Sequence, residues 1–130
     1  MSTIVAGIDT DIDRARALAN GITAIPGTDE LEAILVHSFG ENPEGASVDQ
    51  VASVRRAREI LEAEGVEVTL DESSGDTAAG LIVAAEEHDA DMIVVAGRKR
   101  SPTGKAIFGS VTQDVILGTD RPVLVVSADE

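Results

Sequence analysis

The sequence contains no cysteine, no tryptophan and no tyrosine. Without cysteine, disulfides, thiolate nucleophiles and cysteine-ligated metal sites are excluded. The aromatic residues are two phenylalanines, Phe39 and Phe108, so the core must be aliphatic, and stacking of nucleic-acid bases on aromatic side chains is not available. The apolar runs are too short to cross a bilayer, and the first residues lack the pattern of a secretory signal. We therefore expect a cytoplasmic protein.

Basic residues are also scarce. Ten lysines and arginines face 24 aspartates and glutamates, which gives a net charge of −14, and only Lys99 and Lys105 are lysines. Such a surface repels phosphate backbones and anionic lipids, so nucleic-acid and membrane partners are disfavoured. An acidic, lysine-poor surface suits high salt, where counterions screen its self-repulsion. We hypothesise a salt-adapted source, with an ordinary acidic protein as the alternative.

The residues that are present alternate between two hydrophobic patterns. A length of 130 residues and a hydrophobic fraction of 43% suffice for a core, so we expect one domain, residues 1–130. Short apolar runs predict buried strands, and apolar spacings of three and four predict helices. The expected strands are residues 3–8, 33–39, 66–70, 92–96 and 123–126. The expected helices are residues 12–22 and 51–61, one that begins at 75–77, and one from 109–110 to 118.

This alternation predicts an α/β fold with a single doubly wound parallel sheet of five strands and helices on both faces. Thr10 or Asp11 is available to cap the first helix, and Ser47 and Gln50 have capping-box spacing before the second. In such sheets, ligands bind at the carboxyl ends of the strands, where the strand order reverses. The candidates are the residues that follow the expected strands: Asp9, Ser38, Phe39, Asp71, Gly97 and Ser127.

The segment from Gly97 to Val111 is basic, in contrast to the acidic chain as a whole. Four of the ten basic residues lie between positions 98 and 105, among three glycines. The segment ends at a predicted helix N-terminus, where free N–H groups and the helix dipole favour an anion, with the Ser110 hydroxyl at the expected cap. This pattern indicates polyphosphate binding; the alternative is a solvated loop whose arginines pair with surface carboxylates. A Walker A loop is excluded, because Lys99 stands where the upstream glycine is required and neither Ser nor Thr follows Lys105.

These residues resemble the universal stress protein family. The family motif is Gly, two residues, Gly, nine residues, Gly, then Ser or Thr, and Gly97, Gly109 and Ser110 match it. Arg100 takes the place of the second glycine, and the loop is one residue shorter than in the family motif. The resemblance extends over nearly the whole chain, through Asp9 at the end of the first strand, Gly-Asp-Thr-Ala at 75–78 and Arg-Pro-Val-Leu-Val-Val at 121–126.

The resemblance implies the strand order 3-2-1-4-5 and binding of ATP or another adenine nucleotide, with or without magnesium. Asp9 would then lie beside Gly97 and contact the nucleoside, and the end of the second strand would line the base. From charge alone, we expect Arg98, Arg100 and Lys105 to neutralise phosphates. The candidate nucleotide-binding residues are Asp9, Thr10, Ser38, Ala96, Gly97, Arg98, Arg100, Gly109, Ser110 and Val111.

Several of these residues have an alternative interpretation. Asp9 could instead cap the first helix. His37 lies inside an apolar strand, so we expect a hydrogen-bonded histidine in the core or at the strand end. His88 closes the third helix, where the dipole favours a cation. Neither histidine has the neighbouring ligands that a zinc site requires, so we expect no metal site.

Three functions remain open at this point. The first is a nucleotide-binding stress-response or regulatory protein that acts as a dimeric sensor or switch. The second is a slow ATP hydrolase, which is disfavoured because no activated nucleophile, and no general base other than Asp9, is evident. The third is a dimeric interaction module without nucleotide. For dimerisation, strand 123–126 would lie at the sheet edge and pair with a second copy, as the family commonly does.

Overall fold

The computed structural model describes residues 2–39, 47–97 and 109–127. Within them, five parallel strands form one sheet in the order β3-β2-β1-β4-β5, which confirms the predicted α/β fold and strand order. Two short 3-10 turns, Thr28–Glu30 and Val48–Gln50, precede β2 and α2. The elements are β1 (Ser2–Gly7), α1 (Ile12–Thr23), β2 (Leu31–Ser38), α2 (Ala52–Ala63), β3 (Glu67–Ser73), α3 (Thr77–Glu87), β4 (Met92–Gly97), α4 (Ser110–Gly118) and β5 (Val123–Ser127).

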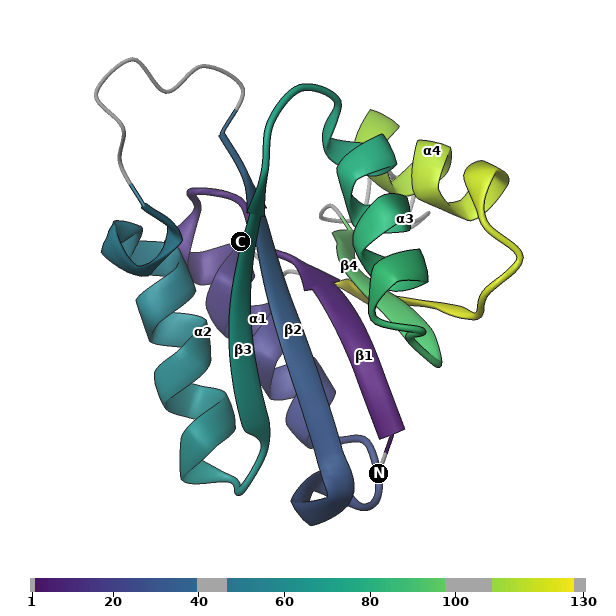
Figure 1. The fold of residues 1–130 in the computed structure, drawn as a ribbon. Coiled ribbons are helices and arrows are strands. Elements are labelled where there is room, and N and C mark those ends of the chain that lie inside the picture. The colour runs from purple at the N-terminus through teal and green to yellow at the C-terminus, as the bar shows by residue number, and fades with distance from the viewer. Residues whose placement is uncertain (1, 40–46, 98–108, 128–130) are drawn as a thin grey trace, which may run out of the picture.

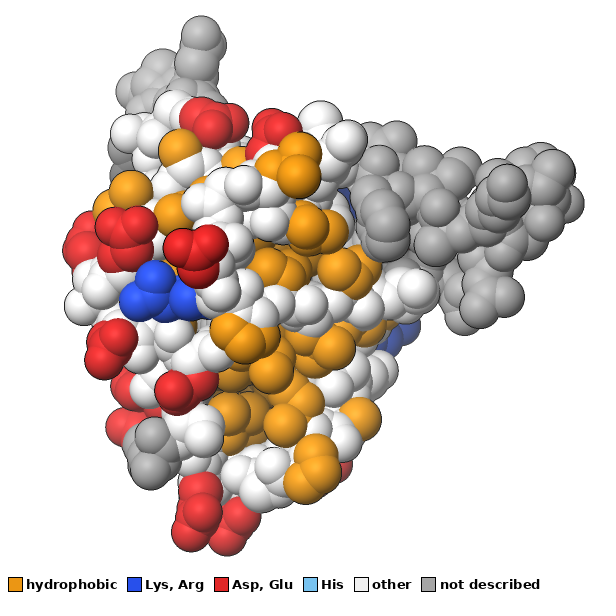
Figure 2. Space-filling model, turned by 90° about the vertical axis from the view of Figure 1, so that its right-hand side faces the viewer, with side chains coloured by type: hydrophobic (Ala, Val, Ile, Leu, Met, Phe, Trp, Pro, Cys, Tyr) orange, Lys and Arg blue, Asp and Glu red, His pale blue; other side chains and the backbone are white. Residues whose placement is uncertain are grey.

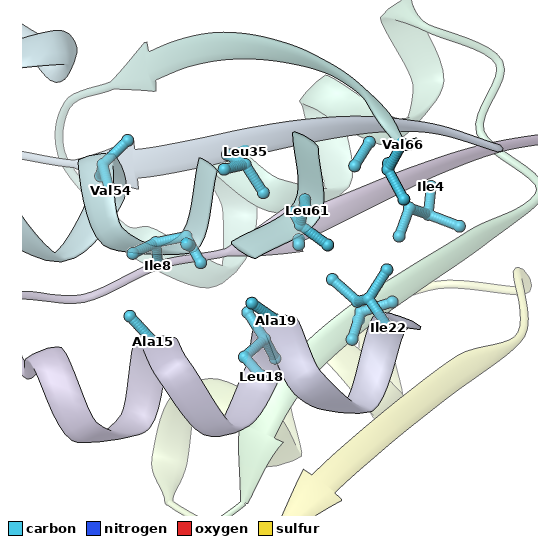
Figure 3. Close-up of a cluster of buried hydrophobic side chains, with 14 of the residues drawn as sticks. Ile4, Ile8, Ala15, Leu18, Ala19, Ile22, Leu35, Val54, Leu61 and Val66 are labelled. Carbon is cyan, nitrogen blue, oxygen red and sulfur yellow. The ribbon is translucent and has the colours of Figure 1, made fainter. Parts of the chain in front are cut away.

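Helices cover both faces of the sheet: α1 and α2 lie on one side, and α3 and α4 on the other (Figure 1). Alternate strand residues point to opposite faces, so Ala33 and Leu35 pack with α1 and α2, whereas Ile34 and Val36 pack with α3. Because both faces are buried, the strands read as continuous apolar runs rather than alternating ones. In Figure 3, Leu18 of α1 and Leu61 of α2 lie in the first of these two cores.

Side-chain caps begin two of the helices. Asp11 accepts a hydrogen bond from the Arg14 N–H at 3.0 Å and caps α1, so the cap is neither Thr10 nor Asp9. Asp76 caps α3 through the Ala79 N–H at 3.2 Å. The predicted capping box is present, but it begins the 3-10 turn Val48–Gln50, and α2 starts only at Ala52. The box therefore sets the approach to α2 and does not cap that helix.

The third strand is longer than its hydrophobic pattern predicts. It runs from Glu67 to Ser73, because Asp71, Glu72 and Ser73 continue the parallel pairing with the last three residues of β2. Backbone hydrogen bonds extend the strand where the side chains are polar, and hydrophobic periodicity does not report this kind of pairing. No helix in the described ranges has the length and hydropathy that a bilayer-spanning segment requires.

The close approach of α1 to β5 generates a stability prediction. A Cβ atom at Gly21 would lie 2.6 Å from Val126 Cγ2, which is a steric overlap. In an exposed helix, Gly→Ala stabilises by ~1 kcal/mol, but overpacking costs ~1–3 kcal/mol. We expect Gly21→Ala to lower the free energy of unfolding by up to about 2 kcal/mol, measured by urea denaturation.

The matched control is Gly118→Ala on α4. There the nearest atom is the tip of the flexible Ile82 side chain, Cδ1 at 2.8 Å, which can turn away. We expect this variant to lose less stability than Gly21→Ala. Equal or greater stability of Gly21→Ala relative to the wild type would show that α1 and β5 are not packed as described.

Candidate functional site

The two halves of the sheet separate at the carboxyl ends of the central strands. β1 pairs with β4 over three residues only and stops at Ala6 opposite Val94. Beyond that point β1 follows β2, since the Ile8 N–H donates to the Val36 carbonyl at 2.9 Å. β4 instead stays with β5 as far as Gly97 opposite Ser127. The opening between β1 and β4 therefore lies where the strand order reverses, the usual ligand position in open α/β sheets.

A cavity of about 490 Å³ lies at this opening. Its volume falls within the range of small-molecule sites, ~300–1,000 Å³. The turn after β1, the end of β2, the end of β4 and the first turns of α1, α3 and α4 all contribute to its wall. The lining residues are Gly7, Ile8, Asp9, Thr10, Arg14, Ala15, Leu18, Val36, His37, Ser38, Phe39, Thr77, Leu81, Val95, Ala96, Val111 and Thr112.

Five of the ten candidate nucleotide-binding residues meet in this cavity: Asp9, Thr10, Ser38, Ala96 and Val111. The other described candidates, Gly97, Gly109 and Ser110, lie at the end of β4 and the start of α4 but are not among the lining residues. Ser110 was expected at the cap of α4. The structure places Gly109 there, with no side-chain cap, and Ser110 is the first helical residue.

Some strand-end candidates fall elsewhere. Phe39 lines the cavity, whereas Asp71 and Ser127 do not. Asp71 lies in β3 opposite Val36 of β2, and its Oδ2 lies 3.5 Å from Nε2 of His88 at the end of α3. The basic candidates Arg98, Arg100 and Lys105 lie outside the described residues.

Sequence reasoning missed Arg14 and Thr112 as cavity residues. Both lie in the first turn of a helix that follows a central strand, β1 for Arg14 and β4 for Thr112. The available signal was position, because the first turn after such a strand faces the opening at the strand ends. The spacing of apolar residues predicted that both lie on amphipathic helices, but it did not indicate that their side chains line the cavity.

Three polar side chains are buried in the described part of the chain, and all three bind carbonyls beside the cavity. Thr112, 3% exposed, donates from Oγ1 to the Ala96 carbonyl at 3.1 Å. Ser53, 1% exposed, donates from Oγ to the Asp9 carbonyl. His37, 5% exposed, has Nδ1 2.7 Å from the Ile8 carbonyl oxygen. A buried polar group without a partner is costly, so these bonds stabilise the separated strand ends.

The bond of His37 also decides its tautomer. A carbonyl oxygen only accepts hydrogen bonds, so Nδ1 carries the proton in this contact. The expectation of a hydrogen-bonded histidine at the strand end is confirmed. Its ring meets the Phe39 ring edge-on, with centroids 4.7 Å apart. The end of β2 is thereby fixed against the end of β1.

Two further contacts hold the carboxylate of Asp9 in place. Its Oδ1 accepts a hydrogen bond from the Asp11 N–H at 2.9 Å, and its Oδ2 lies 2.9 Å from Arg14 Nε. The Asp9 side chain is 52% exposed, and each carboxylate oxygen can accept more than one hydrogen bond. Asp9 is therefore a fixed acceptor that remains open to a ligand. Across residues 2–39, 47–97 and 109–127, no three potential ligand side chains are grouped so that they could hold a metal ion.

The sequence model of the universal stress protein family matches residues 1–127. This chain belongs to the universal stress protein family. A universal stress protein of Mycolicibacterium smegmatis is 28% identical over 124 residues, which span 95% of each chain. The solved universal stress protein of Archaeoglobus fulgidus is 30% identical, with a TM-score of 0.77 and coverage of 97% of this chain and 98% of that one. The family resemblance noted from the sequence is confirmed.

Two further solved universal stress proteins share the fold and were crystallised with adenine nucleotides. One is in complex with cAMP; it is 22% identical, with a TM-score of 0.73 and 98% coverage of both chains. The other, from Archaeoglobus fulgidus, is in complex with dAMP; it is 23% identical, with a TM-score of 0.71 and coverage of 97% and 98%. At 22% and 23% sequence identity, these two structures show that this universal stress protein shares their fold.

The hydrogen bond of Thr112 generates a prediction for this site. Thr112→Val keeps the shape of the side chain but leaves the Ala96 carbonyl without its donor. Because the lost partner is buried, we expect the free energy of unfolding to fall by ~1–3 kcal/mol. Urea denaturation measures this change. Thr69→Val on β3 is the control, since Thr69 is exposed, and it should change stability by less than ~0.5 kcal/mol. Equal effects of the two substitutions would contradict the assignment.

Proposed function

We propose that this universal stress protein binds an adenine nucleotide, with ATP as the leading candidate, in the cavity between β1 and β4. The observation that carries the proposal is that a cavity of about 490 Å³ contains Asp9, a carboxylate held by its neighbours. The complexes of two solved neighbours with cAMP and dAMP support the choice of ligand. The protein would act as a cytoplasmic regulatory protein whose ligand-bound state is read by partners.

The chemistry of the lining suits such a ligand. Val36, Leu81, Val95 and Val111 provide apolar walls for a base. The Asp9 carboxylate can accept hydrogen bonds from a sugar hydroxyl or a base amino group. The first turn of α4 borders the cavity, and a helix N-terminus favours a phosphate through its free N–H groups and its dipole. The lining therefore offers an apolar contact for a base, an acceptor for a sugar or amino group and a helix N-terminus for a phosphate.

Binding is better supported than catalysis. Thr112 donates its hydroxyl to a backbone carbonyl, and Ser38 does the same to the Gly75 carbonyl at 3.5 Å. Within the described part of the cavity, no hydroxyl is hydrogen-bonded to a histidine or carboxylate that could activate it. Asp9 is itself engaged by Asp11 and Arg14. A sensor function needs only a ligand that stabilises one state of the protein.

Nucleotide binding can be tested by thermal unfolding with and without ATP, AMP and cAMP. A ligand at 100 times its Kd stabilises the folded state by ~2.7 kcal/mol, so we expect the midpoint of the wild type to rise. Val111→Trp should abolish the rise, because the larger side chain occupies the cavity. Ile116→Trp is the matched control: it lies on the same helix, is 41% exposed and does not line the cavity. Measurements at low and molar salt separate ligand effects from screening of the acidic surface.

Two results would contradict this proposal. No shift of the wild-type midpoint with any of the three nucleotides would favour a dimeric interaction module without nucleotide. A shift that survives Val111→Trp unchanged would place the nucleotide outside this cavity.

We also propose that the protein forms a two-fold homodimer through β5. β5 is an edge strand, and Val123, Leu124, Val125 and Val126 are only half-buried in the single chain. The molecule is turned in Figure 2 so that the side of α4 faces the viewer, and hydrophobic side chains form a band down this face, with acidic side chains along one flank. An exposed apolar edge invites pairing with another strand, and a two-fold axis lets identical strands cover each other.

The dimer is tested by measuring molar mass in solution at tens of micromolar. We expect the mass of a dimer for the wild type. Val125→Lys places a charge on the edge strand and should yield monomers. Val83→Lys, at a valine of α3 that is 50% exposed, should leave the dimer intact. A wild-type monomer at this concentration would refute the proposal.

A further inference from the structure

Arg14 is the one lysine or arginine among the described residues that line the cavity. It lies in the first turn of α1, five residues after Asp9, and its side chain is 30% exposed. The chain as a whole has a net charge of −14. Arg14 is therefore a partly buried cation at the cavity of a strongly acidic protein, and not a fully solvated surface side chain.

The contacts of Arg14 are made by charge rather than by aligned hydrogen bonds. Nε lies 2.9 Å from Asp9 Oδ2, yet among the described residues this buried nitrogen has no hydrogen-bond acceptor in line with its N–H. Nη2 lies 3.6 Å from Asp11 Oδ2, which is beyond hydrogen-bond distance. The guanidinium thus stands between two carboxylates. The position of Arg14 therefore fits compensation of the carboxylate charge. The helix cap in this turn comes from Asp11, and the structural hydrogen bond comes from Ser53, which donates to the Asp9 carbonyl.

The charge balance of the cavity depends on this pair. Asp9 contributes one negative charge to the described lining, and Arg14 contributes one positive charge. Arg14 also lies 3.6 Å from Asp11, which does not line the cavity, but its contact with Asp9 is shorter, so it offsets part of the Asp9 charge while Asp9 accepts hydrogen bonds from the nucleoside. Without Arg14, the same carboxylate would repel the phosphates of an incoming nucleotide, and the interaction would grow with the number of phosphate charges. A neutral nucleoside would feel no such repulsion.

We propose that Arg14 is a positioning residue that compensates and orients Asp9 and thereby makes the cavity accept phosphorylated adenosines. This inference rests on the proposed nucleotide binding and names the residue that gives the site its tolerance for phosphate. Arg14 acts through Asp9, so its effect disappears when the charge of Asp9 is removed. The effect is electrostatic, so salt weakens it.

Calorimetric titration of ATP, AMP and adenosine into the wild type and into Arg14→Gln tests the inference. We expect Arg14→Gln to weaken ATP binding about tenfold, which corresponds to ~1.4 kcal/mol, AMP binding less, and adenosine binding less than about twofold. The double variant Asp9→Asn/Arg14→Gln should bind ATP more tightly than Arg14→Gln alone, because the uncompensated charge is gone. A purely structural role of Arg14 would not produce this rescue.

Arg16→Gln is the matched control. Arg16 lies on α1 two residues after Arg14 and does not line the cavity, and its side chain lies 4.0 Å from Asp13. We therefore expect Arg16→Gln to leave the affinities for ATP, AMP and adenosine unchanged. Equal losses for ATP and adenosine in Arg14→Gln, no loss for either, or no rescue in the double variant would each overturn the role of Arg14. Failure of the wild type to bind any of the three compounds would instead overturn the proposed function itself.

Discussion

The separation of β1 from β4 is the constraint on which the rest of this structure depends. From β1 the chain builds outward through β2 to β3 and then returns to the other side of β1 to place β4 and β5. The outward and returning connections lie on opposite faces of the sheet (Figure 1). The helices that follow β1 and β4, α1 and α4, lie on opposite faces, so the carboxyl ends of the two central strands diverge and leave a cavity.

Divergence exposes backbone groups that a closed sheet would pair. Beyond Ala6 and Val94, β1 and β4 no longer pair with each other. Nearly all of the described interior is aliphatic, and its three buried polar side chains, His37, Ser53 and Thr112, donate to carbonyls at this point. The same bonds fix the turn that carries Asp9. The same three hydrogen bonds therefore satisfy buried polar groups and fix the positions of the strand ends that form the cavity wall.

Much of this architecture could be predicted from the sequence. Periodicity placed every helix and strand within a few residues, and the largest error, the end of β3, arose because polar residues extend a backbone ladder that hydrophobicity cannot report. For the site, strand ends and the family resemblance led to Asp9 and Ser38 in the cavity. Arg14 and Thr112 were missed as cavity residues. Their sequence spacing places them on helices, but which strand end each side chain faces is defined only when the helix packs against the sheet.

The sequence by itself determined the elements, their burial on two faces and the acidic surface, because hydrophobic period and charge are local properties of the chain. Only the tertiary structure decided where β1 and β4 part, which carbonyls receive buried donors and that Arg14 stands beside Asp9. The reason is physical: the bonds to carbonyls depend on distances between residues far apart in the sequence, such as Ser53 and Asp9 or Thr112 and Ala96. The contact of Arg14 with Asp9 is local in the sequence, but only the folded turn shows which way the two side chains point. Packing sets those distances, and no single segment contains them.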